Sequence, residues 1–342
     1  MGSLVFDAFL LLGFGGPEAR DEVMPFLRHV TAGRNVPEER LLAVAEHYFH
    51  FEGVSPINQH NRELLAALGD EFGTRGIPLP LYWGNRNSAP WLADTVQQLA
   101  DDGVRRALVL ATSATGGYSG CRQYRENLRD ARTDGSPELV KLRHFFNHPG
   151  FIEANADRVR AALTELEDAD GARLVFTAHS IPVAMNNVAG PSGNLYLEQQ
   201  RETARLVAEE LRGKGADFDL VWQSRSGPPQ VPWLDPDVND HLEALAAQGV
   251  RSVVIAPTGF VSDHLEVLWD LDNEARETAE RLGVTMVRAG TVGTHPAFVR
   301  AVCELVLERT DGAERRAIGA MGPSWDECPF ADGCCTSRAG TP

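Results

Sequence analysis

The sequence predicts an α/β protein made of two doubly wound domains, each a parallel sheet covered by helices, that face a central cleft. Short apolar runs alternate with amphipathic stretches along most of the chain, which is typical of β-α-β units. The apolar runs are nearly continuous, as expected of strands buried on both faces of a parallel sheet. With 342 residues, 43% of them hydrophobic, the chain is long enough for two cores.

The expected strands are seven short apolar runs, three in the first half of the chain and four in the second. They cover residues 6–12, 79–83, 107–111, 174–177, 220–222, 253–256 and 285–287. The expected helices carry apolar residues at helical spacing along one face. They cover residues 38–50, 59–72, 91–102, 121–132, 195–212, 238–248, 264–282 and 296–309. This order of elements gives each domain its own sheet.

The segment Glu165–Gly171 is acidic and ends in glycine, which marks it as the expected division between the two halves. We therefore expect an N-terminal domain over residues 1–168 and a C-terminal domain over 169–310. Residues 311–342 lose helical periodicity and become rich in Gly, Pro and Cys, so we expect them to form a tail.

The charge balance and the amino end limit the partners and the location. The net charge is 32 − 48 = −16, which argues against nucleic-acid or anionic-membrane binding, because phosphate contacts need clustered Lys and Arg. The first seven residues have no basic segment typical of a secretory signal. No apolar stretch approaches the roughly 18 residues that a spanning helix needs. We expect a cytoplasmic protein without a transmembrane segment.

The five cysteines are better explained by a metal site than by disulfides. Their number is odd and a cytoplasmic compartment is reducing, so a disulfide framework is not expected. Three of them, Cys328, Cys334 and Cys335, fall within eight residues of the tail. An iron–sulfur cluster needs four thiolates, and the fourth is either Cys121, which opens a predicted helix, or Cys303. Cys303 lies within a predicted helix and is more typical of a small buried apolar residue.

Polar residues follow several of the predicted strands directly. His179 ends one strand, Ser224 and Arg225 follow a second, Glu266 opens the helix after a third, and Arg86 follows a strand in the first half. In parallel sheets ligands bind beyond the carboxyl ends of the strands. The run Gly13-Phe14-Gly15-Gly16-Pro17 does not complete a dinucleotide motif, because position 18 is Glu, and no phosphate-binding loop motif is present.

Glu266, Asp270 and Glu274 are spaced four apart, which on a helix places three carboxylates along one stripe. Like charges at this spacing repel by a few tenths of a kcal/mol per pair, so a cation moving along the stripe is one reason for it. The alternative is structural: Asp263 caps the helix with Glu266 reaching back to it, and the other two acids form a solvated face. The sequence leaves both readings open.

His179 is either a core histidine or a proton acceptor and transient metal ligand, because an imidazole titrates near neutrality at roughly pH 6.5. Arg86 and Arg225 are either surface charges or partners for carboxylate ligands. Tyr48, Tyr118 and Tyr124 add aromatic faces with hydroxyl tips. Together these side chains suit a flat, apolar ligand that carries carboxylates.

Six segments in the same order along nearly the whole chain resemble the ferrochelatase family. They are Leu12–Pro17, Gly53–Asn58, Thr177–Pro182, Trp222–Gly227, Pro232–Asp237 and Gly259–Glu266. The resemblance implies two Rossmann-like domains of the type-II chelatase fold with a porphyrin between them, and a lyase activity that inserts ferrous iron into that porphyrin.

The resemblance also implies roles for individual residues. His179 matches the catalytic histidine and Glu266 the acidic residue that faces it across the porphyrin plane, and both would ligate the substrate Fe²⁺. Asp270 and Glu274 match an acidic iron path. Contacts to the porphyrin propionates would come from Tyr48, Ser55, Arg86 and Tyr124. Phe14 departs from the tyrosine of many bacterial relatives, and some basic propionate contacts are missing near Thr31 and Ala32.

The cysteines are similar to the 2Fe-2S site of actinobacterial and animal members, with Cys121, Cys328, Cys334 and Cys335 as expected ligands. The adjacent pair Cys334-Cys335 departs from the usual spacing. Residues 18–35 alternate charged and apolar residues and offer no apolar lip, which favours coproporphyrin III over protoporphyrin IX as the substrate. The product, Fe-coproporphyrin (coprohaem), places the protein in haem biosynthesis, with transient contacts to neighbouring pathway enzymes.

Three alternative functions remain open. The first is a protoporphyrin IX ferrochelatase. The second is a porphyrin or haem carrier with a redox-sensing cluster, and the third is a cobalt or nickel chelatase of the same fold. Metallation assays with different porphyrins and metals distinguish them.

Overall fold

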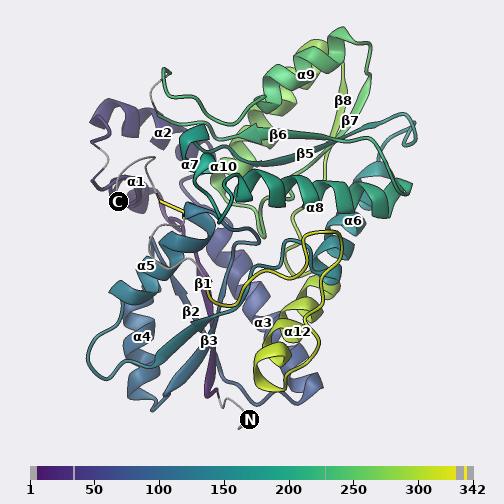
Figure 1. Ribbon diagram of the computed structural model, residues 1–342. Coiled ribbons are helices and arrows are strands. Elements are labelled where there is room, and N and C mark those ends of the chain that lie inside the picture. The colour runs from purple at the N-terminus through teal and green to yellow at the C-terminus, as the bar shows by residue number, and fades with distance from the viewer. Residues whose placement is uncertain (1–5, 34, 228, 329–334, 337–342) are drawn as a thin grey trace.

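The computed structural model describes residues 6–33, 35–227, 229–328 and 335–336. Two parallel sheets of four strands each lie one above the other in the molecule (Figure 1). The first sheet has the strand order β2-β1-β3-β4 and the second has β6-β5-β7-β8. The strands are β1 (Ala8–Gly13), β2 (Leu81–Asn85), β3 (Arg106–Ala111), β4 (Glu138–Lys141), β5 (Arg173–His179), β6 (Asp219–Gln223), β7 (Ser252–Ala256) and β8 (Thr285–Arg288).

The helices lie on both faces of each sheet. They are α1 (Val23–Val30), α2 (Glu38–His50), α3 (Ile57–Arg75), α4 (Leu92–Asp101), α5 (Gln123–Asp130), α6 (Pro149–Leu163), α7 (Val183–Asn187), α8 (Leu195–Arg212), α9 (Val238–Ala247), α10 (Leu265–Val267), α11 (Arg276–Leu282) and α12 (Pro296–Thr310). Short η segments are η1 (Arg20–Glu22), η2 (Tyr118–Arg122) and η3 (Leu268–Ala275), of which η2 and η3 are π-helical.

Alternation along the strands shows that both sheets are doubly wound. In β1, Phe9 and Leu11 pack into one core cluster with α3, whereas Ala8, Leu10 and Leu12 pack into another with α4 and α5. Successive strand residues point to opposite faces, so each face buries its own helices. In the second sheet the same alternation separates a cluster with α6, α8 and α12 from one with α9 and α11. The predicted fold class is confirmed.

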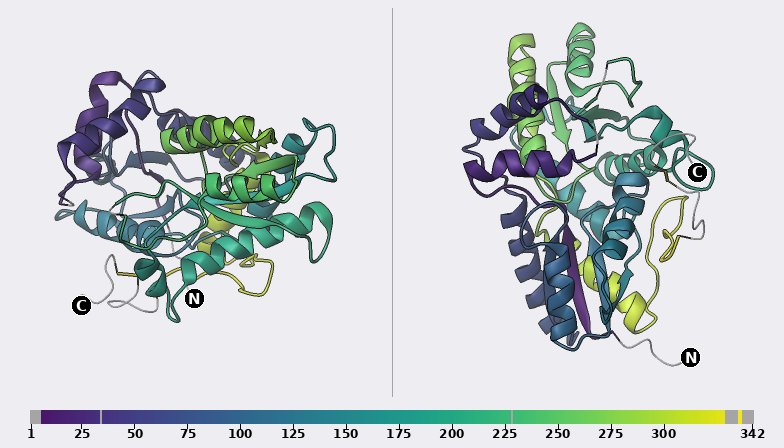
Figure 2. Two further views of the ribbon diagram at one scale, coloured as in Figure 1. Left: turned by 90° about the horizontal axis from the view of Figure 1, so that it is seen from above. Right: turned by 90° about the vertical axis from the view of Figure 1, so that its left-hand side faces the viewer.

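One core cluster joins the two sheets into a single body. It contains residues of β1 and β3 together with residues of β5 and β7, and α6 and α12 fill the space between them. The two further views show the helices α1 and α2, in dark purple, beside the second sheet (Figure 2). Leu265 of α10 packs into their cluster, so these early helices contact the loops of the second half. Division into domains at residues 168 and 310 stays a proposal.

Several elements were not predicted, for identifiable reasons. The edge strand β4 was missed because its sequence, Glu-Leu-Val-Lys, has only two apolar residues between charged ones. The helices α1, α6 and α7 were also missed; α6 begins with Pro149-Gly150, a pair that normally marks a turn. The predicted helix over 264–282 is correct in extent, but its middle part is the π-helix η3.

Among the described residues, none of the helices has the length and apolar character required to cross a membrane.

Candidate functional site

His179 is the last residue of β5, where its side chain is 37% exposed. The five strand residues ahead of it, Leu174–Ala178, are buried, so the sheet fixes the backbone of the histidine. The Nδ1 of His179 lies 2.5 Å from the carbonyl oxygen of Ser180. The hydroxyl of Tyr196 donates a hydrogen bond to the carbonyl oxygen of His179 at 2.8 Å. Because the Nδ1–H is donated to the carbonyl oxygen of Ser180, Nε2 is the basic nitrogen of the ring.

Glu266 lies against this Nε2. Its Oε2 is 3.6 Å from the ring nitrogen, and the carboxylate is 47% exposed. The strands β5 and β7 are hydrogen-bonded neighbours, so the segment after β7 returns Glu266 to the end of β5. The resemblance implies that these two groups face each other across the porphyrin, whereas the structure places them in direct contact. A carboxylate at this distance stabilises a proton taken up by His179.

The alternative prediction, in which Asp263 caps the helix and Glu266 reaches back to it, is wrong. The N-cap of α10 is His264, and no side chain caps that helix. Asp263 instead binds the guanidinium of Arg288 through two hydrogen bonds of 3.1 and 3.2 Å. Glu266 therefore does not serve a capping box and remains available to His179.

The second acid, Asp270, lies in the π-helix η3 and points toward the end of β6. It accepts hydrogen bonds from Ser224 Oγ and from Gln223 Nε2, the latter at 3.2 Å. Ser224 adopts a left-handed backbone with φ of +59°, a conformation that costs energy for a residue with a side chain. Burial, together with the charges of Glu266 and Glu274, raises the pKa of Asp270 to about 7, although the hydrogen bond from Ser224 opposes this rise.

Glu274, the third acid, is oriented by Trp269 of the same π-helix, which in turn stacks on a histidine from the N-terminal part of the chain. Its Oε1 accepts a 2.9 Å hydrogen bond from Trp269 Nε1. The imidazole of His47 in α2 stacks on the indole of Trp269 with 4.0 Å between centroids and 8° between planes. The three acids thus follow one another along α10 and η3, and π-turns of this kind are frequent at functional sites.

Two predicted substrate residues, Arg86 and Tyr124, contact each other directly. The guanidinium carbon of Arg86 lies 4.6 Å from the ring centroid of Tyr124 and 5.5 Å from that of Phe14. Within the part of the chain that the structure describes, the Nε of Arg86 is buried without a hydrogen-bond partner. A guanidinium held between two rings in this way is suited to a carboxylate ligand.

The other two predicted substrate residues are buried, as Tyr124 also is at 4% exposure. Tyr48 is 5% exposed and packs on Phe26, while burial and the charge of Glu266 hold the pKa of its hydroxyl well above the usual range. Ser55 is 4% exposed and lies under Gly16. The structure does not bring either hydroxyl to the surface beside Arg86, and their contact with substrate stays a prediction.

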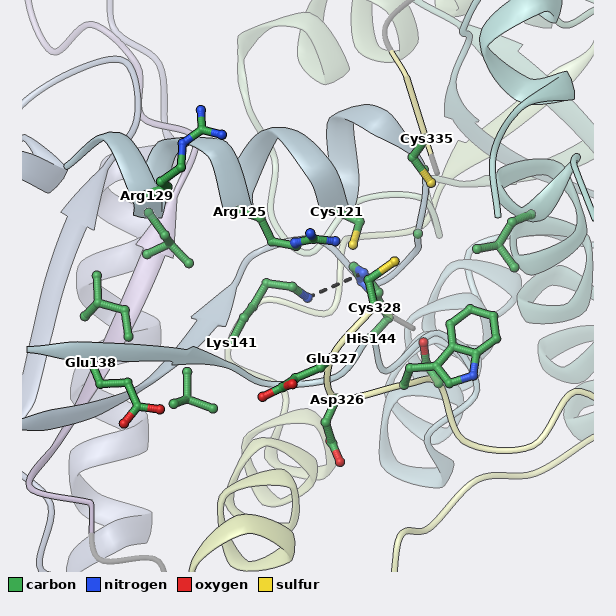
Figure 3. A pocket seen from close by; sticks show the side chains of 18 of the residues that line it. Cys121, Arg125, Arg129, Glu138, Lys141, His144, Asp326, Glu327, Cys328 and Cys335 are labelled. Carbon is green, nitrogen blue, oxygen red and sulfur yellow. Dashed lines mark hydrogen bonds between the residues drawn. The ribbon is translucent and has the colours of Figure 1, made fainter. Parts of the chain in front are cut away.

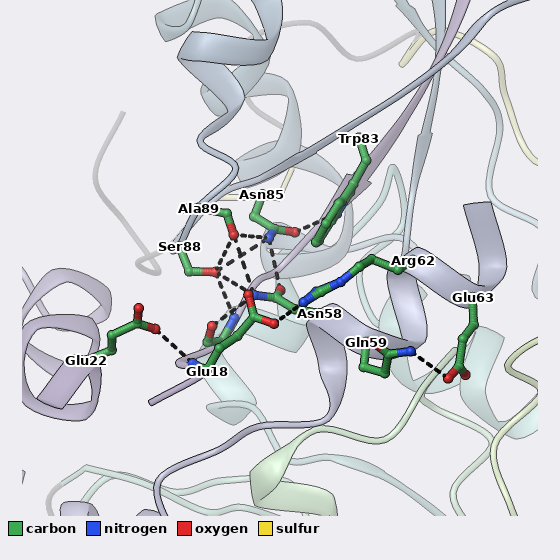
Figure 4. A network of polar contacts seen from close by, with 11 residues as sticks. Glu18, Glu22, Asn58, Gln59, Arg62, Glu63, Trp83, Asn85, Ser88 and Ala89 are labelled. Atoms are coloured by element: carbon green, nitrogen blue, oxygen red, sulfur yellow. Dashed lines mark hydrogen bonds and ion pairs between the residues drawn. The ribbon is translucent and has the colours of Figure 1, made fainter. Parts of the chain in front are cut away.

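A polar network fixes the loop that carries Phe14 (Figure 4). Asn58 donates to the carbonyl oxygen of Gly16 at 3.1 Å, and the amide of Gly16 donates to Ser88 Oγ at 3.0 Å. Asn85, at the end of β2, donates to Asn58 Oδ1 at 3.0 Å. Gly15 has φ of +85°, and a Cβ there would lie 2.6 Å from Ser88 Oγ, so only glycine fits. The network holds the two strand ends that present Phe14 and Arg86.

The predicted cluster cysteines converge on a different site. Cys121, Cys328 and Cys335 line one cavity of about 390 Å³ together with the cations Arg125 and Lys141 and with His144 (Figure 3). Burial raises the pKa of the Cys121 thiol, and the charge of Lys141 opposes this. Cys334 lies outside the described residues. In the described part of the chain, no three His, Cys, Asp or Glu side chains are close enough to hold a metal ion.

Cys303 does not belong to this site. It is fully buried in α12 within the largest core cluster, and burial raises the pKa of its thiol to about 12. The prediction that it is a small buried apolar residue is confirmed.

Sequence reasoning missed four residues near these two sites: His47, Lys141, His264 and Trp269. Burial lowers the pKa of His264, and the opposing charge of Glu266 shows that this imidazole lies near the first acid. A signal existed for it, because it stands two residues before Glu266 in the same motif. No local signal exists for His47, since its partner Trp269 is more than 200 residues away along the chain.

The fold is that of the type-II chelatases. A solved structure of "SirB from Bacillus subtilis with Fe3+" aligns with a TM-score of 0.53 at 13% identity, over 90% of this chain and 97% of that one. A multi-domain protein from Deinococcus radiodurans, DR2241, described as structurally similar to chelatases, aligns with a TM-score of 0.51 at 19% identity, over 92% of this chain and 57% of that one. At these identities the likeness shows the fold alone.

The chain belongs to the ferrochelatase family, whose sequence profile matches residues 6–310. A protein of Nocardia farcinica named coproporphyrin III ferrochelatase is 55% identical and covers 98% of both chains. A protein of the same name from Streptomyces coelicolor is 52% identical over 98% of this chain and 95% of its own length.

Proposed function

We propose that the protein inserts ferrous iron into coproporphyrin III and so produces Fe-coproporphyrin in haem biosynthesis. The observation that carries the proposal is the contact between His179 Nε2 and Glu266 Oε2 at 3.6 Å, followed along the chain by Asp270 and Glu274. The names of the relatives from Nocardia and Streptomyces support coproporphyrin III as the substrate. A cytoplasmic location and contacts with neighbouring pathway enzymes remain predictions.

In this proposal His179 and Glu266 act on the same side of the porphyrin. A flat ring between them would need about 7 Å, twice the contact distance of roughly 3.5 Å between carbon atoms. The observed 3.6 Å leaves no such space. We therefore revise the expectation that Glu266 faces His179 across the ring: the pair approaches one face together, and the loop with Phe14 and Arg86 lies at the end of the other sheet.

His179 takes up the pyrrole protons. A free porphyrin keeps two N–H protons, and both must leave when iron enters. Nε2 is the free basic nitrogen, because Nδ1 faces the carbonyl oxygen of Ser180, and the adjacent carboxylate of Glu266 stabilises the imidazolium that forms. Bending the ring exposes its nitrogen lone pairs, at a cost of ~1–5 kcal/mol that substrate binding offsets.

The acids guide the iron. Oxygen and imidazole ligands bind Fe²⁺ only moderately, which allows the ion to exchange ligands stepwise and move on to the ring. Glu274 is the exposed outer acid, Asp270 the half-buried middle one and Glu266 the acid beside His179. With a pKa of about 7, Asp270 populates both its protonated and its charged form near neutral pH, so it can release a proton as a cation arrives.

Arg86 anchors the substrate. Its guanidinium is held by two aromatic rings and has a buried Nε without a partner among the described residues. A propionate of the porphyrin supplies the missing acceptor through a charge-assisted hydrogen bond. Coproporphyrin III carries four carboxylates and protoporphyrin IX two, so the former offers more chances for this contact.

The cysteine cavity holds a 2Fe-2S cluster in this proposal, with Cys121, Cys328, Cys334 and Cys335 as ligands. Its support is the convergence of three of these thiols on one cavity from distant parts of the chain. Cys335 is tied to the second half of the molecule, since its backbone N–H donates to Val188 O at 3.2 Å and its Sγ accepts from Gly190 N at 3.4 Å. The cluster would link the start of α5 to the loop after α7.

The test is steady-state metallation with Fe²⁺, comparing coproporphyrin III with protoporphyrin IX. We expect turnover of coproporphyrin III with a higher kcat/KM, and a loss of about 10²–10⁴-fold in His179→Ala, the usual contribution of a positioned general base. His241→Ala is the matched control. That imidazole pairs with Asp219 at 3.1 Å at the start of β6, whereas His179 lies at the end of the neighbouring parallel strand β5. Unchanged turnover in a folded His179→Ala protein would refute the mechanism, and porphyrin binding without turnover would favour a carrier.

A further inference from the structure

The helix that carries the acids is held at both edges of the second sheet. Asp270 accepts hydrogen bonds from Gln223, the last residue of the edge strand β6, and from Ser224 after it. Asp272, two residues further along η3, accepts a 2.7 Å hydrogen bond from the Nε of Arg288, the last residue of the other edge strand, β8. Residues two apart on a helix do not face the same way, so η3 is tied across the carboxyl end of the sheet.

Arg288 also holds the segment that leads into this helix. Its two terminal nitrogens donate to the two carboxylate oxygens of Asp263 at 3.1 and 3.2 Å, so the guanidinium fork meets that carboxylate with two parallel hydrogen bonds. Asp263 precedes Glu266 along the chain, and Asp272 follows it. One guanidinium therefore fixes the chain on both sides of the acid that contacts His179.

Arg288 is the better placed of the two arginines near Asp272. Its side chain is only 14% exposed. Arg276 is 51% exposed, lies 3.8 Å from the Asp272 carboxylate, and donates to the backbone carbonyl oxygen of that residue at 3.2 Å. An exposed pair of this kind contributes little, whereas an enclosed guanidinium with three directed hydrogen bonds restricts where its partners can lie.

The pairing also separates two kinds of acid on the same stretch of chain. Arg288 neutralises Asp263 and Asp272. The three acids of the proposed iron path form no ion pair with Lys or Arg in the described part of the chain, and Asp270 and Glu274 are bound by neutral donors. Like charges spaced four apart on a helix repel each other, so a stripe without its own counter-ions needs support from elsewhere.

We propose that Arg288 is a positioning residue for iron insertion, which holds η3 and the segment before it so that the three acids keep the arrangement that Fe²⁺ needs. This inference rests on the proposed function. Arg288 acts on the path only through Asp263 and Asp272, the two carboxylates that it binds. An arginine suits this task because its planar fork binds carboxylates in fixed directions, whereas a lysine offers one point charge.

The experiment is steady-state metallation of coproporphyrin III by the purified protein under anaerobic conditions, with KM measured separately for Fe²⁺ and for the porphyrin. We expect Arg288→Met to raise the KM for Fe²⁺ about tenfold, the lower end of the usual loss when a partner that orients metal ligands is removed. The KM for porphyrin should stay nearly unchanged. Asp272→Ala, which keeps the pair between Arg288 and Asp263, should show most of the same rise.

Two further variants separate positioning from charge and from stability. Arg288→Lys keeps the charge but cannot bind both carboxylates in the same way, so it should recover only part of the KM for Fe²⁺. Arg281→Met is the matched control, because it removes an exposed arginine of α11 that pairs with Glu243 of α9 at 2.8 Å. It should keep both KM values of the parent protein. Thermal unfolding of each variant ensures that all assays are run on folded protein.

The outcomes distinguish this inference from the proposed function. If the parent protein does not metallate the porphyrin, both are overturned together. If the parent turns over and a folded Arg288→Met protein keeps its KM for Fe²⁺, only the inference is overturned. An equal rise of both KM values, or complete recovery by Arg288→Lys, would overturn it as well. If Arg288→Met does not fold, Asp272→Ala decides by the same criterion.

Discussion

The site at the end of the second sheet and the cysteine cavity differ in the side chains that they would offer to iron under the proposed function. The first offers an imidazole and three carboxylates, and its groups are already paired inside the chain: His179 with Glu266, Asp270 with Ser224, and Glu274 with Trp269. The second offers thiols beside two cations without carboxylate partners in the described part of the chain. Hard, moderately binding ligands suit an ion that passes through, whereas thiolates suit an ion that stays.

The largest effect expected from this comparison is on the proposed 2Fe-2S cluster. Cys328→Ser should remove the absorption of the 2Fe-2S cluster and its acid-labile sulfide almost completely, because a cluster needs four thiolates. Cys303→Ala is the matched control, since Cys303 is buried in the core away from the cavity. Iron analysis and the visible spectrum of the purified proteins measure both. A fully loaded Cys328→Ser protein would break the comparison by showing that the tail does not bind the cluster.

The second effect concerns Asp270, the middle acid of the site that contains His179. Because the pKa of Asp270 rises from 3.8 to about 7 on folding, the folded state binds its proton more tightly than the unfolded state. Its contribution to stability is present below about pH 4 and is lost as the pH rises toward 7. Asp270→Asn cannot ionise, so its stability relative to the parent should grow across this range, by on the order of a few kcal/mol.

Thermal unfolding at pH 4, 5.5, 7 and 8 measures this difference. Glu274→Gln is the control, because it replaces an exposed carboxylate of the same acid stripe by its amide. A constant offset between Asp270→Asn and the parent at all four pH values would contradict the raised pKa. It would also weaken the idea that the site exchanges a proton for a cation.

Much of this arrangement could be predicted from the sequence, because it depends on local patterns. Seven of the described strands follow from their apolar runs. That His179 and Glu266 belong to one site follows from their positions at the end of β5 and shortly after β7, which are neighbours in the sheet, but their direct contact was not predicted. The spacing of the three acids was visible too, but the π-helical turn that points Asp270 at Ser224 was not, since four-residue spacing fits either kind of helix.

What could not be predicted depends on contacts between distant segments. Lys141 lies on an edge strand too short and too charged to be recognised, and its position beside Cys121 and Cys328 follows only from the tertiary fold. Tyr48, Ser55 and Tyr124 match positions that contact porphyrin propionates by resemblance, and packing buries all three. Local pattern therefore places the strand-end residues well, whereas burial and long-range pairing need the structure.

The third effect tests whether the opposite sheet binds the substrate carboxylates. Arg86→Ala should raise the KM for coproporphyrin III about 10–100-fold with a smaller change in kcat, because a charged hydrogen bond contributes about 1.5–3 kcal/mol. Arg225→Ala is the matched control: its guanidinium donates to Pro229 O and Val231 O of its own loop, at 3.1 and 3.4 Å. Equal KM values for Arg86→Ala and the parent would remove Arg86 from the substrate site.

The smallest effect concerns the contact that joins the early helices to the acids. His47→Ala removes the ring stacked on Trp269 at 4.0 Å and should lower the free energy of unfolding by about 0.5–1.5 kcal/mol, the usual contribution of an aromatic pair. His47→Phe keeps a flat ring and should restore most of this stability. Urea unfolding at pH 8, where an imidazole is neutral, gives both values.

The same pair of variants shows whether the stack also serves the iron path. Trp269 donates to Glu274, so losing its partner on α2 should loosen the outer acid and raise the KM for Fe²⁺ modestly, while the KM for porphyrin stays unchanged. His47→Phe should recover both the stability and the KM. If His47→Ala lowers the stability but leaves the KM for Fe²⁺ unchanged, the stack only joins the two halves of the molecule. The iron path would then end at Asp270. The contrast with the cysteine cavity would then rest on two acids and a histidine.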